Sequence, residues 1–421
     1  MNQYIYRAIP VQKLDWSRVR TQVGQGRLVA AIDVAKDLQF MALMREDRSV
    51  IHTVKWSHPD HTRHLTECLG ELGAERIEAV MEPSGTYGDA LRGCLRAAGI
   101  GVYRVSPKKV HDAAEVYDGV PSMHDAKAAY VIGRLHLEGV TRLWVEPDDQ
   151  RRRLQVQLNR LADARDRAQR LSSRLEALLA RHWPEGPRLM DSQSVSWLQL
   201  LAGYGDPAAV AADRDEAAAL LRRVGGQRLK AAKIEALLAS ATNTVGMRCM
   251  EIEAERLREL AAEQIDLRRR CRSLERALAR EVPHDGGLEA QSRAVGTVTA
   301  VVLRCALGGV DAYPNAASYA KAAGLNLKER SSGKHRGQLK LTKRGPGVVR
   351  FYVYFAVLRL VAHDGPAQAW YRAKVTRDGG LTGPAIGALM RKLIRALWHV
   401  GHGEAFDETK LFGVVRQERA A

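Results

Sequence analysis

Two adjacent serines, Ser331 and Ser332, lie in the most basic stretch of the chain, residues 328–345 (KERSSGKHRGQLKLTKRG). The stretch holds eight basic residues, one of them a histidine, against a single carboxylate. Its three glycines predict a flexible loop rather than a helix face. A small hydroxyl in such a field is either an ordinary loop residue or a nucleophile that attacks a phosphodiester.

Three carboxylates in the first third of the chain occupy positions that suit a divalent metal. Asp33 ends an apolar strand (RLVAAIDVA), Glu82 ends another (RIEAVMEP), and Asp125 begins a helix. Hard oxygen ligands gathered in this way hold Mg²⁺ (or Mn²⁺) beside a phosphate. Simpler explanations exist, because Asp125 suits a helix N-cap and Glu82 precedes a turn at Pro83. The joint placement of the three acids favours the metal site.

The elements that must position these acids are predicted in residues 27–149. Three strands at hairpin distances come first, followed by helix, strand, helix, strand and helix. This order predicts an α/β RNase H-like (RuvC-like), metal-dependent domain after an N-terminal extension, residues 1–26. A doubly wound nucleotide-binding fold is the competing interpretation, but neither a G-x-G-x-x-G motif nor a P-loop follows the first strand.

Residues 150–289 are rich in Arg, Ala, Leu and Glu, which predicts long helices. Apolar residues recur at spacings of three and four along two segments, typical of a coiled coil between antiparallel helices or between protomers. A shorter helical insert is expected at 207–240. The seam residues are Leu161, Ala164, Ala168, Leu171, Leu175 and Leu178 in the first segment, and Met250, Leu257, Leu260, Leu267, Cys271, Leu274 and Leu278 in the second.

Residues 290–412 predict a compact α-helical domain that displays the serine loop, followed by a tail, residues 413–421. The domain begins with AVGTVTAVVLRCALGG, where a glycine leads into a helix whose first amides could bind a phosphate. Two further apolar helices follow the loop, VVRFYVYFAVLRLVAH and GPAIGALMRKLIRALWHV.

The charge balance indicates a polyanionic partner. The chain has 65 basic and 48 acidic residues in 421, a formal net charge of +17 and a pI near 9.8. Such an excess is typical of proteins that bind nucleic acid. Five cysteines without a CxxC pair predict reduced, mostly buried thiols. With neither a signal peptide nor an apolar stretch long enough for a membrane, we expect a cytoplasmic, nucleoid-associated prokaryotic protein with no membrane partner.

Several motifs together resemble the DEDD serine transposases, the insertion-sequence family related to the Piv invertase. The motifs are AIDVAKD, AVMEPSGTYGDALRGCLRAAGIGVYRVSPKKV, HDAKAAYVIGRL and YAKAAGLNLKERSSGKHRGQLKLTKRGPGVVR. The resemblance covers the first 145 residues and residues 290 to 400. It implies an RNA-guided DNA transposase or recombinase, in which a bridge-type guide RNA selects double-stranded target and donor DNA.

The resemblance also implies roles for single residues. Asp33, Glu82 and Asp125 match the first three of the family's four acids. The fourth, three residues further along the same helix, falls on Ala128, whose methyl group cannot ligate a metal. This copy is therefore expected to be impaired in cleavage, either as a natural degenerate copy or through a deliberate substitution. Asp112 and Asp118 lie nearby as substitutes, without the helical spacing.

In the same family a serine directly before the loop glycine attacks DNA and becomes covalently linked to it. Ser332 occupies that position, and Ser331 is the second candidate. Flanking cations would stabilise the phosphoryl transition state; the phosphate-binding candidates are Lys334, Arg336, Lys343 and Arg344. The sequence departs from the family at Asn326-Leu327, where a proline is usual, which loosens the alignment of the loop but leaves Ser-Gly intact.

The acids and the serine are about 200 residues apart, so a shared site requires the chain to fold back or two protomers to meet. The resemblance implies the second arrangement, in a homo-oligomer from dimer to tetramer. Two alternatives stay open. One is a Holliday-junction resolvase-like nuclease that uses water as its nucleophile, and the other is a non-catalytic protein that binds RNA or DNA.

Overall fold

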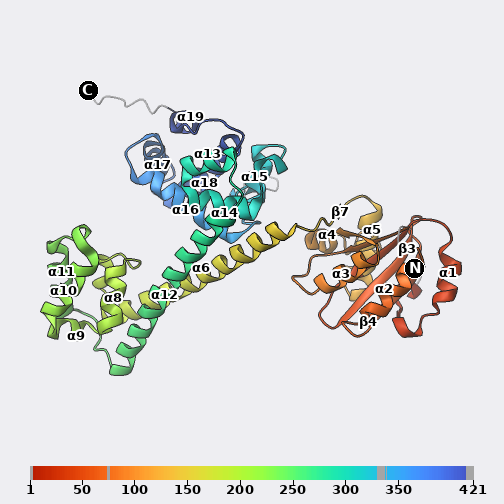
Figure 1. Cartoon of the computed structure of the whole chain (residues 1–421), viewed down its shortest axis with the longest axis horizontal. Coiled ribbons are helices and arrows are strands. Elements are labelled where there is room, and N and C mark those ends of the chain that lie inside the picture. The colour runs from red at the N-terminus through yellow and green to blue at the C-terminus, as the bar shows by residue number, and fades with distance from the viewer. Residues whose placement is uncertain (1–2, 74–75, 330–336, 338, 414–421) are drawn as a thin grey trace. The chain divides into compact units, whose positions relative to one another are not determined.

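The computed structural model describes residues 3–73, 76–329, 337 and 339–413. It divides into two compact units, Met1–Glu146 and Pro147–Ala421. The first contains a mixed sheet with helices on both faces, and the second consists mostly of helices (Figure 1). In the described parts of the chain, no helix combines the length and the apolar character needed to cross a membrane.

The first unit is built on a sheet whose described strands follow the order β1-β4-β3-β2-β5-β6-β7. β3 is antiparallel to both β2 and β4, whereas β2, β5 and β6 are parallel to one another. Antiparallel hairpins on one side and helix-linked parallel strands on the other are what an RNase H-like domain requires. The strands are β1 (Ala8–Pro10), β2 (Leu28–Asp33), β3 (Leu38–Arg45), β4 (Val50–Ser57), β5 (Ile77–Met81), β6 (Gly101–Arg104) and β7 (Arg142–Leu143).

Helices cover both faces of this sheet because strand residues alternate between the faces. Leu28, Ala30 and Ile32 of β2 share a core with α1, α2 and α3, whereas Val29 and Ala31 pack on the side of α5. The N-terminal residues belong to the same unit, since β1 pairs with β4 and α1 contributes buried valines to the core. The helices are α1 (Trp16–Val23), α2 (Thr62–Glu71), α3 (Asp89–Ala97), α4 (Pro107–Asp112) and α5 (Asp125–Leu137).

Two long helices, α6 (Asp149–His182) and α12 (Glu251–Glu281), pack against each other in the second unit. Leu158 early in α6 shares an apolar cluster with Leu278 late in α12, and Leu175 late in α6 shares another with Leu257 early in α12. The helices therefore run antiparallel within one chain. Met250 was expected in this seam but is 59% exposed, because α12 begins only after it.

The segment between α6 and α12 folds into a small helical insert with its own core. The C-terminal part of α6 and the N-terminal part of α12 contribute to this core. It extends beyond the predicted 207–240, because α7 and α8 precede that range. Trp183 and Trp197 are almost fully buried in its core. The insert contains α7 (Gly186–Leu189), α8 (Val195–Tyr204), α9 (Pro207–Ala212), α10 (Arg214–Gly225) and α11 (Ala231–Thr242).

The C-terminal part of the second unit is a helical domain that packs on the N-terminal part of α6 and the C-terminal part of α12. A short two-stranded ribbon, β8 and β9, interrupts its helices and carries the serine loop. The elements are α13 (Gly286–Val295), α14 (Thr297–Leu307), α15 (Ala316–Ala322), β8 (Leu327–Lys328), β9 (Lys340–Leu341), α16 (Gly347–Ala362), α17 (Pro366–Arg377), α18 (Thr382–Gly401) and α19 (Glu408–Phe412).

Candidate active site

Asp33 and Glu82 leave the sheet side by side. β2 and β5 are parallel neighbours in which Ile32 pairs with Met81, so the next residue of each strand is one of the two acids. Val29, Ala31 and Val80 lie on the α5 face of the sheet. Because side chains alternate along a strand, Asp33 falls on the same face as Val29 and Ala31, and Glu82 on the same face as Val80. Both carboxylates therefore extend from the same sheet edge toward the side that α5 covers.

The third acid, Asp125, stands at the start of α5. His124 caps the helix by accepting the amide hydrogen of Lys127 at its Nδ1 (3.3 Å), so Asp125 is the first helical residue and not the N-cap. The alternative explanation of Asp125 as an N-cap is therefore wrong. Its negative charge contributes to raising the pKa of Asp33, although the Asp125 side chain is exposed.

Asp33 and Glu82 line a pocket of about 600 Å³ that is walled by α4, the segment after it, and the first turn of α5. Ala128 lines the same pocket and is 8% exposed. The position of the expected fourth acid thus lies in the same pocket as Asp33 and Glu82, but it presents a methyl group.

The protonation of these acids reflects their crowding. Burial, followed by the negative charges of Asp125 and Glu82, raises the pKa of Asp33 to about 7. Burial also raises the pKa of Glu82, against the effect of a long hydrogen bond from the Ser84 hydroxyl (3.4 Å). Near neutral pH, Asp33 therefore holds a proton for part of the time, and a cation among the acids would displace that proton.

The donor set fits a hard divalent cation, because it consists of carboxylate oxygens that repel one another without one. The carboxylate oxygens of Asp33, Glu82 and Asp125 do not all lie within 4.8 Å of one another. Asp33 and Glu82 share one pocket, whereas Asp125 is exposed and is not among the residues that line it, so the role of the three acids as ligands stays a prediction.

The two substitute acids differ in their surroundings. Asp112 lines the pocket, but it is half exposed and paired with Lys108 one helical turn earlier. Asp118 is buried and binds the Nζ of Lys127 (2.8 Å) and the hydroxyl of Tyr6 (3.1 Å). Asp118 thus links Tyr6 to Lys127, and it is not among the residues that line the pocket.

Two residues that sequence analysis did not single out contribute to this site. Lys127 is 2% exposed, and its ammonium also donates to the carbonyl of Val120 (2.6 Å), which fixes the segment before α5. Glu115 adds a fourth carboxylate to the pocket wall. A lysine on the apolar face of a predicted helix was the available signal for Lys127, whereas Glu115 lies in an irregular segment without a periodic pattern.

The serine loop lies between β8 and β9 in the sequence, and the residues that flank these two strands are tightly packed. These flanking residues form the base of the ribbon. Ser331, Ser332, Lys334 and Arg336 lie outside the described residues, whereas Lys343 and Arg344 are described and exposed. Leu327 pairs with Leu341, and the amide of Lys343, at a strained φ of +53°, donates to the carbonyl of Gly324 (3.0 Å).

At the base of the ribbon, Gly345 lies so close to neighbouring backbone that no side chain fits at this position. A Cβ at this position would lie 2.4 Å from the carbonyl oxygen of Ala322 and 2.7 Å from the amide nitrogen of Gly324. The carbonyl of Gly345 accepts a hydrogen bond from Arg350 (2.7 Å). The described residues on the two sides of the loop are thereby held together.

A basic and aromatic surface lies where α6, α12 and α16 meet. Arg165, Arg268 and Arg272 line a pocket of about 310 Å³ together with Phe351 and Phe355. Arg165 pairs with Glu275, but Nη1 of Arg268 is buried and has no hydrogen-bond partner among the described residues. Burial lowers the pKa of Arg268, and the charge of Arg272 lowers it further. An anion is the partner that such a guanidinium lacks.

A larger cavity of about 690 Å³ adjoins this surface and reaches the start of α14. Gly296, with φ of +84°, precedes the helix, as the glycine-led helix start predicted. Arg359 lies in the cavity wall and donates to the carbonyl of Val295 (2.8 Å). Basic and aromatic side chains thus continue from the long helices to the C-terminal domain.

Comparison with known protein families gives two matches. Residues 30–184 match the DEDD model of IS110 elements, which is described as a transposase, and residues 290–372 match the transposase IS116/IS110/IS902 family. The first match contains Asp33, Glu82 and Asp125, and the second contains the serine loop and α16. No curated protein matches the chain. The chain carries the domains of an IS110/IS116/IS902 family transposase.

Proposed function

We propose that the chain is an RNA-guided DNA transposase or recombinase of an insertion sequence that cuts and rejoins DNA through Ser332. The two transposase domains support DNA as the substrate. The observation that supports the chemistry is that Asp33 and Glu82 leave neighbouring strands to line one pocket, where burial and the charges of Asp125 and Glu82 raise the pKa of Asp33 to about 7. Carboxylates crowded in this way are stabilised in their charged form by a bound cation.

The proposed step is a phosphoryl transfer. The hydroxyl of Ser332 loses its proton as Oγ forms a bond to the phosphorus, the bond from phosphorus to a deoxyribose oxygen breaks, and the leaving oxygen takes up a proton, so that the step releases and consumes one proton. The reverse step rejoins a strand and frees the serine. Mg²⁺ held by the three acids would supply Lewis-acid stabilisation of the phosphate. The basic side chains of Lys334, Arg336, Lys343 and Arg344 neutralise the non-bridging oxygens.

The acids and the serine belong to different units, so the proposal includes a homo-oligomer, dimer to tetramer. In it the acids of one protomer act on DNA that is held by the serine of another. Lys343 and Arg344, exposed at the base of the ribbon, support the presentation of the loop to a partner of negative charge.

Guide RNA is proposed to bind the Arg-rich segments around 151–170 and 268–280. The support for this is the unpaired, half-buried guanidinium of Arg268 between Arg165 and Arg272, with two phenylalanines beside it. Cationic groups bind phosphates and aromatic rings stack on unpaired bases, a combination suited to structured RNA.

Ala128 supports a second candidate, a relative that binds nucleic acid but cleaves slowly or not at all. The pocket wall at this position lacks the oxygen that an aspartate would supply. The two candidates differ in one measurable property, the rate of DNA cleavage in the presence of the divalent metal.

The test is a strand-cleavage assay with the full chain, its flanking-element RNA and DNA, and Mg²⁺. We expect Ala128→Asp to cleave at least about 10-fold faster than the unsubstituted chain, since ligand-shell changes typically have effects of this size. Adding Glu82→Gln should abolish the gain. Equal rates with and without Ala128→Asp would contradict the proposal that a fourth acid at this position is needed for full cleavage. Salt-sensitive binding with no cleavage by any variant would establish the second candidate.

A further inference from the structure

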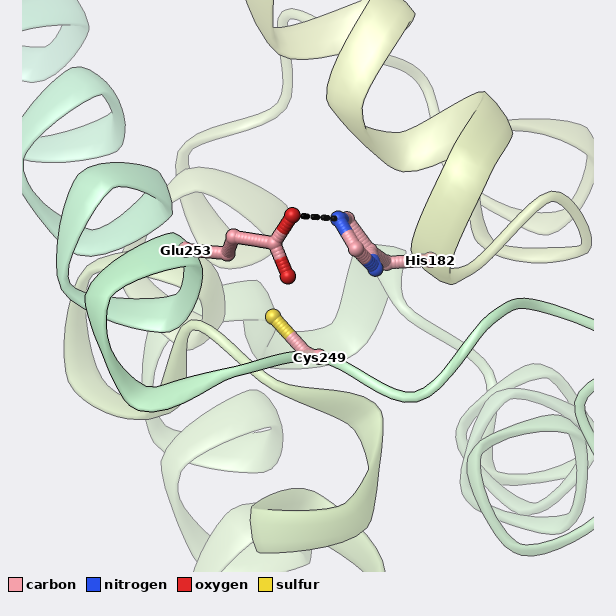
Figure 2. Close-up of side chains that lie close together, drawn as sticks. All are labelled: His182, Cys249 and Glu253. Carbon is pink, nitrogen blue, oxygen red and sulfur yellow. Dashed lines mark ion pairs between the residues drawn. The ribbon is translucent and has the colours of Figure 1, made fainter.

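Three potential metal ligands meet in the second unit, at the neck of the helical insert, where the end of α6 and the start of α12 join it. His182 ends α6, Cys249 lies two residues before α12 begins, and Glu253 lies in the first turn of α12. Figure 2 shows the imidazole, the thiol and the carboxylate turned toward one another. One ligand atom from each residue lies within 4.8 Å of the others, the only such group among the described residues.

The hydrogen bonding of His182 directs a free lone pair into this cluster. Its Nδ1 lies 3.1 Å from the carbonyl oxygen of Met247, which can only accept, so Nδ1 carries the hydrogen. In the neutral ring, Nε2 is then a lone-pair donor. Nε2 is buried and has no hydrogen-bond partner in the described parts of the chain. A histidine that donates Nδ1–H to a carbonyl and presents Nε2 is the arrangement found in metal sites.

An ion pair between a protonated His182 and Glu253 explains the cluster less well. Nε2 and Oε1 of Glu253 are 3.5 Å apart, longer than the 2.7–2.9 Å of a charge-assisted hydrogen bond. Tetrahedral zinc with ordinary bond lengths separates its nitrogen and oxygen ligands by about 3.3–3.6 Å. The observed spacing therefore suits a shared ion better than a direct bond.

The surroundings of Cys249 also favour a cation. Glu253 faces its thiol within the cluster, and the negative charges of Asp206 and Glu251 also act on Cys249. A bound cation would offset the negative charge that these carboxylates place around the half-buried sulfur. Arg181, 3.5 Å from Oε1 of Glu253, is the one neighbouring cation that competes for this carboxylate among the described side chains.

Contacts within the protein hold these three residues in place without the help of a metal. Gly246 passes so close to the end of α6 that a Cβ would lie 2.0 Å from the carbonyl oxygen of His182. The amide of Met247 donates to the carbonyl of Arg181 (2.8 Å). Oε2 of Glu253 accepts the amide hydrogen of Met250 (3.0 Å), which leaves Oε1 directed toward the histidine. The site is thus preorganised from both sides of the neck.

We propose that Nε2 of His182, Sγ of Cys249 and Oε1 of Glu253 bind a zinc-class transition-metal ion. Nitrogen, sulfur and oxygen donors together select such an ion over Mg²⁺. On binding, the S–H bond of Cys249 breaks, the metal–sulfur bond forms and the proton passes to solvent. With three protein ligands, water occupies the fourth position. The ion would join the two ends of the insert and restrain it, independently of the proposed transposase chemistry.

The test uses Co²⁺ as the probe on the full chain, stripped with a chelator and kept reduced. We expect about one Co²⁺ per chain with a thiolate-to-cobalt charge-transfer band that Zn²⁺ displaces. Cys249→Ser should abolish the band, and Glu253→Gln, whose amide oxygen can still accept from Met250, should weaken Co²⁺ binding by about 10-fold or more. Cys94→Ser is the matched control, because this thiol is free and exposed.

Two results would overturn the proposal. One is the absence of a charge-transfer band in the folded, unsubstituted chain. The other is a band that persists unchanged in Cys249→Ser but disappears in Cys94→Ser. Asp33→Asn should leave the band unchanged, so a failure of this site and a failure of the carboxylate site are distinguishable.

Discussion

Replacing Asp33 by asparagine should stabilise the first unit at alkaline pH when no divalent metal is present. The folded state raises the pKa of this carboxyl from 3.8 to about 7 through burial and the charges of Asp125 and Glu82. Between these two values the folded chain binds more protons at Asp33 than the unfolded chain does. Stability therefore falls as pH rises from about 4 and levels off above about 7.

The magnitude follows from the size of this rise. At about 1.36 kcal/mol for each pH unit, ionised Asp33 costs about 4 kcal/mol at pH 8. The pocket is open to water, which screens part of this cost, so we expect Asp33→Asn to gain about 2 kcal/mol at pH 8 and much less at pH 5. Mg²⁺ should then stabilise the unsubstituted chain at pH 8 but have little effect on Asp33→Asn.

Calorimetric unfolding of the full chain at both pH values, with and without Mg²⁺, measures these differences. Asp112→Asn is the control, because this exposed acid is paired with Lys108 and its pKa is lowered rather than raised. It should show no stabilisation at pH 8. If Asp33→Asn destabilises the chain at pH 8, or if its effect is the same at pH 5, the electrostatic account of the pocket is wrong.

Two further changes test other parts of the account. Lys127→Met should destabilise the first unit by about 3 kcal/mol, because it leaves Asp118 buried without its cation; urea unfolding measures this, and a loss under 1 kcal/mol would contradict it. Arg268→Gln should weaken binding to structured RNA and reduce the salt dependence by about one counterion, whereas Arg269→Gln, whose guanidinium pairs with Asp266, should have a smaller effect. Identical salt slopes for the Arg268→Gln variant and the unsubstituted chain would argue against the RNA-binding surface.

Patterns with a strong period made the strands and helices of the fold predictable. The alternation in RLVAAIDVA places Asp33 at the end of β2, and the spacing of leucines predicts α6 and α12. The sequence predicts an N-terminal extension rather than a strand, because β1 is only three residues long and is defined by its pairing with β4. Met250 fitted the heptad spacing but lies just before the helix begins, and spacing alone does not show where a helix starts.

The candidate site residues were predictable only where a motif marked them. Asp33, Glu82 and Asp125 stand at element ends that the sequence reveals, whereas Lys127 depends on its partner Asp118 in an irregular segment. The cluster of His182 and Cys249 escaped notice because 66 residues separate the two and only the folded insert brings them together. Long-range contacts of this kind leave no local pattern.

The most direct test of the central claim is whether a covalent bond forms between Ser332 and DNA. The measurement is a denaturing gel of the Ala128→Asp chain with RNA, labelled DNA and Mg²⁺. We expect a protein–DNA adduct that Ser332→Ala abolishes while RNA and DNA affinity stay nearly unchanged, and that Ser331→Ala leaves largely intact. Loss of the adduct in Ser331→Ala alone would assign the nucleophile to the other serine. Cleavage that continues in both variants, with no adduct, would contradict the claim and establish water as the nucleophile.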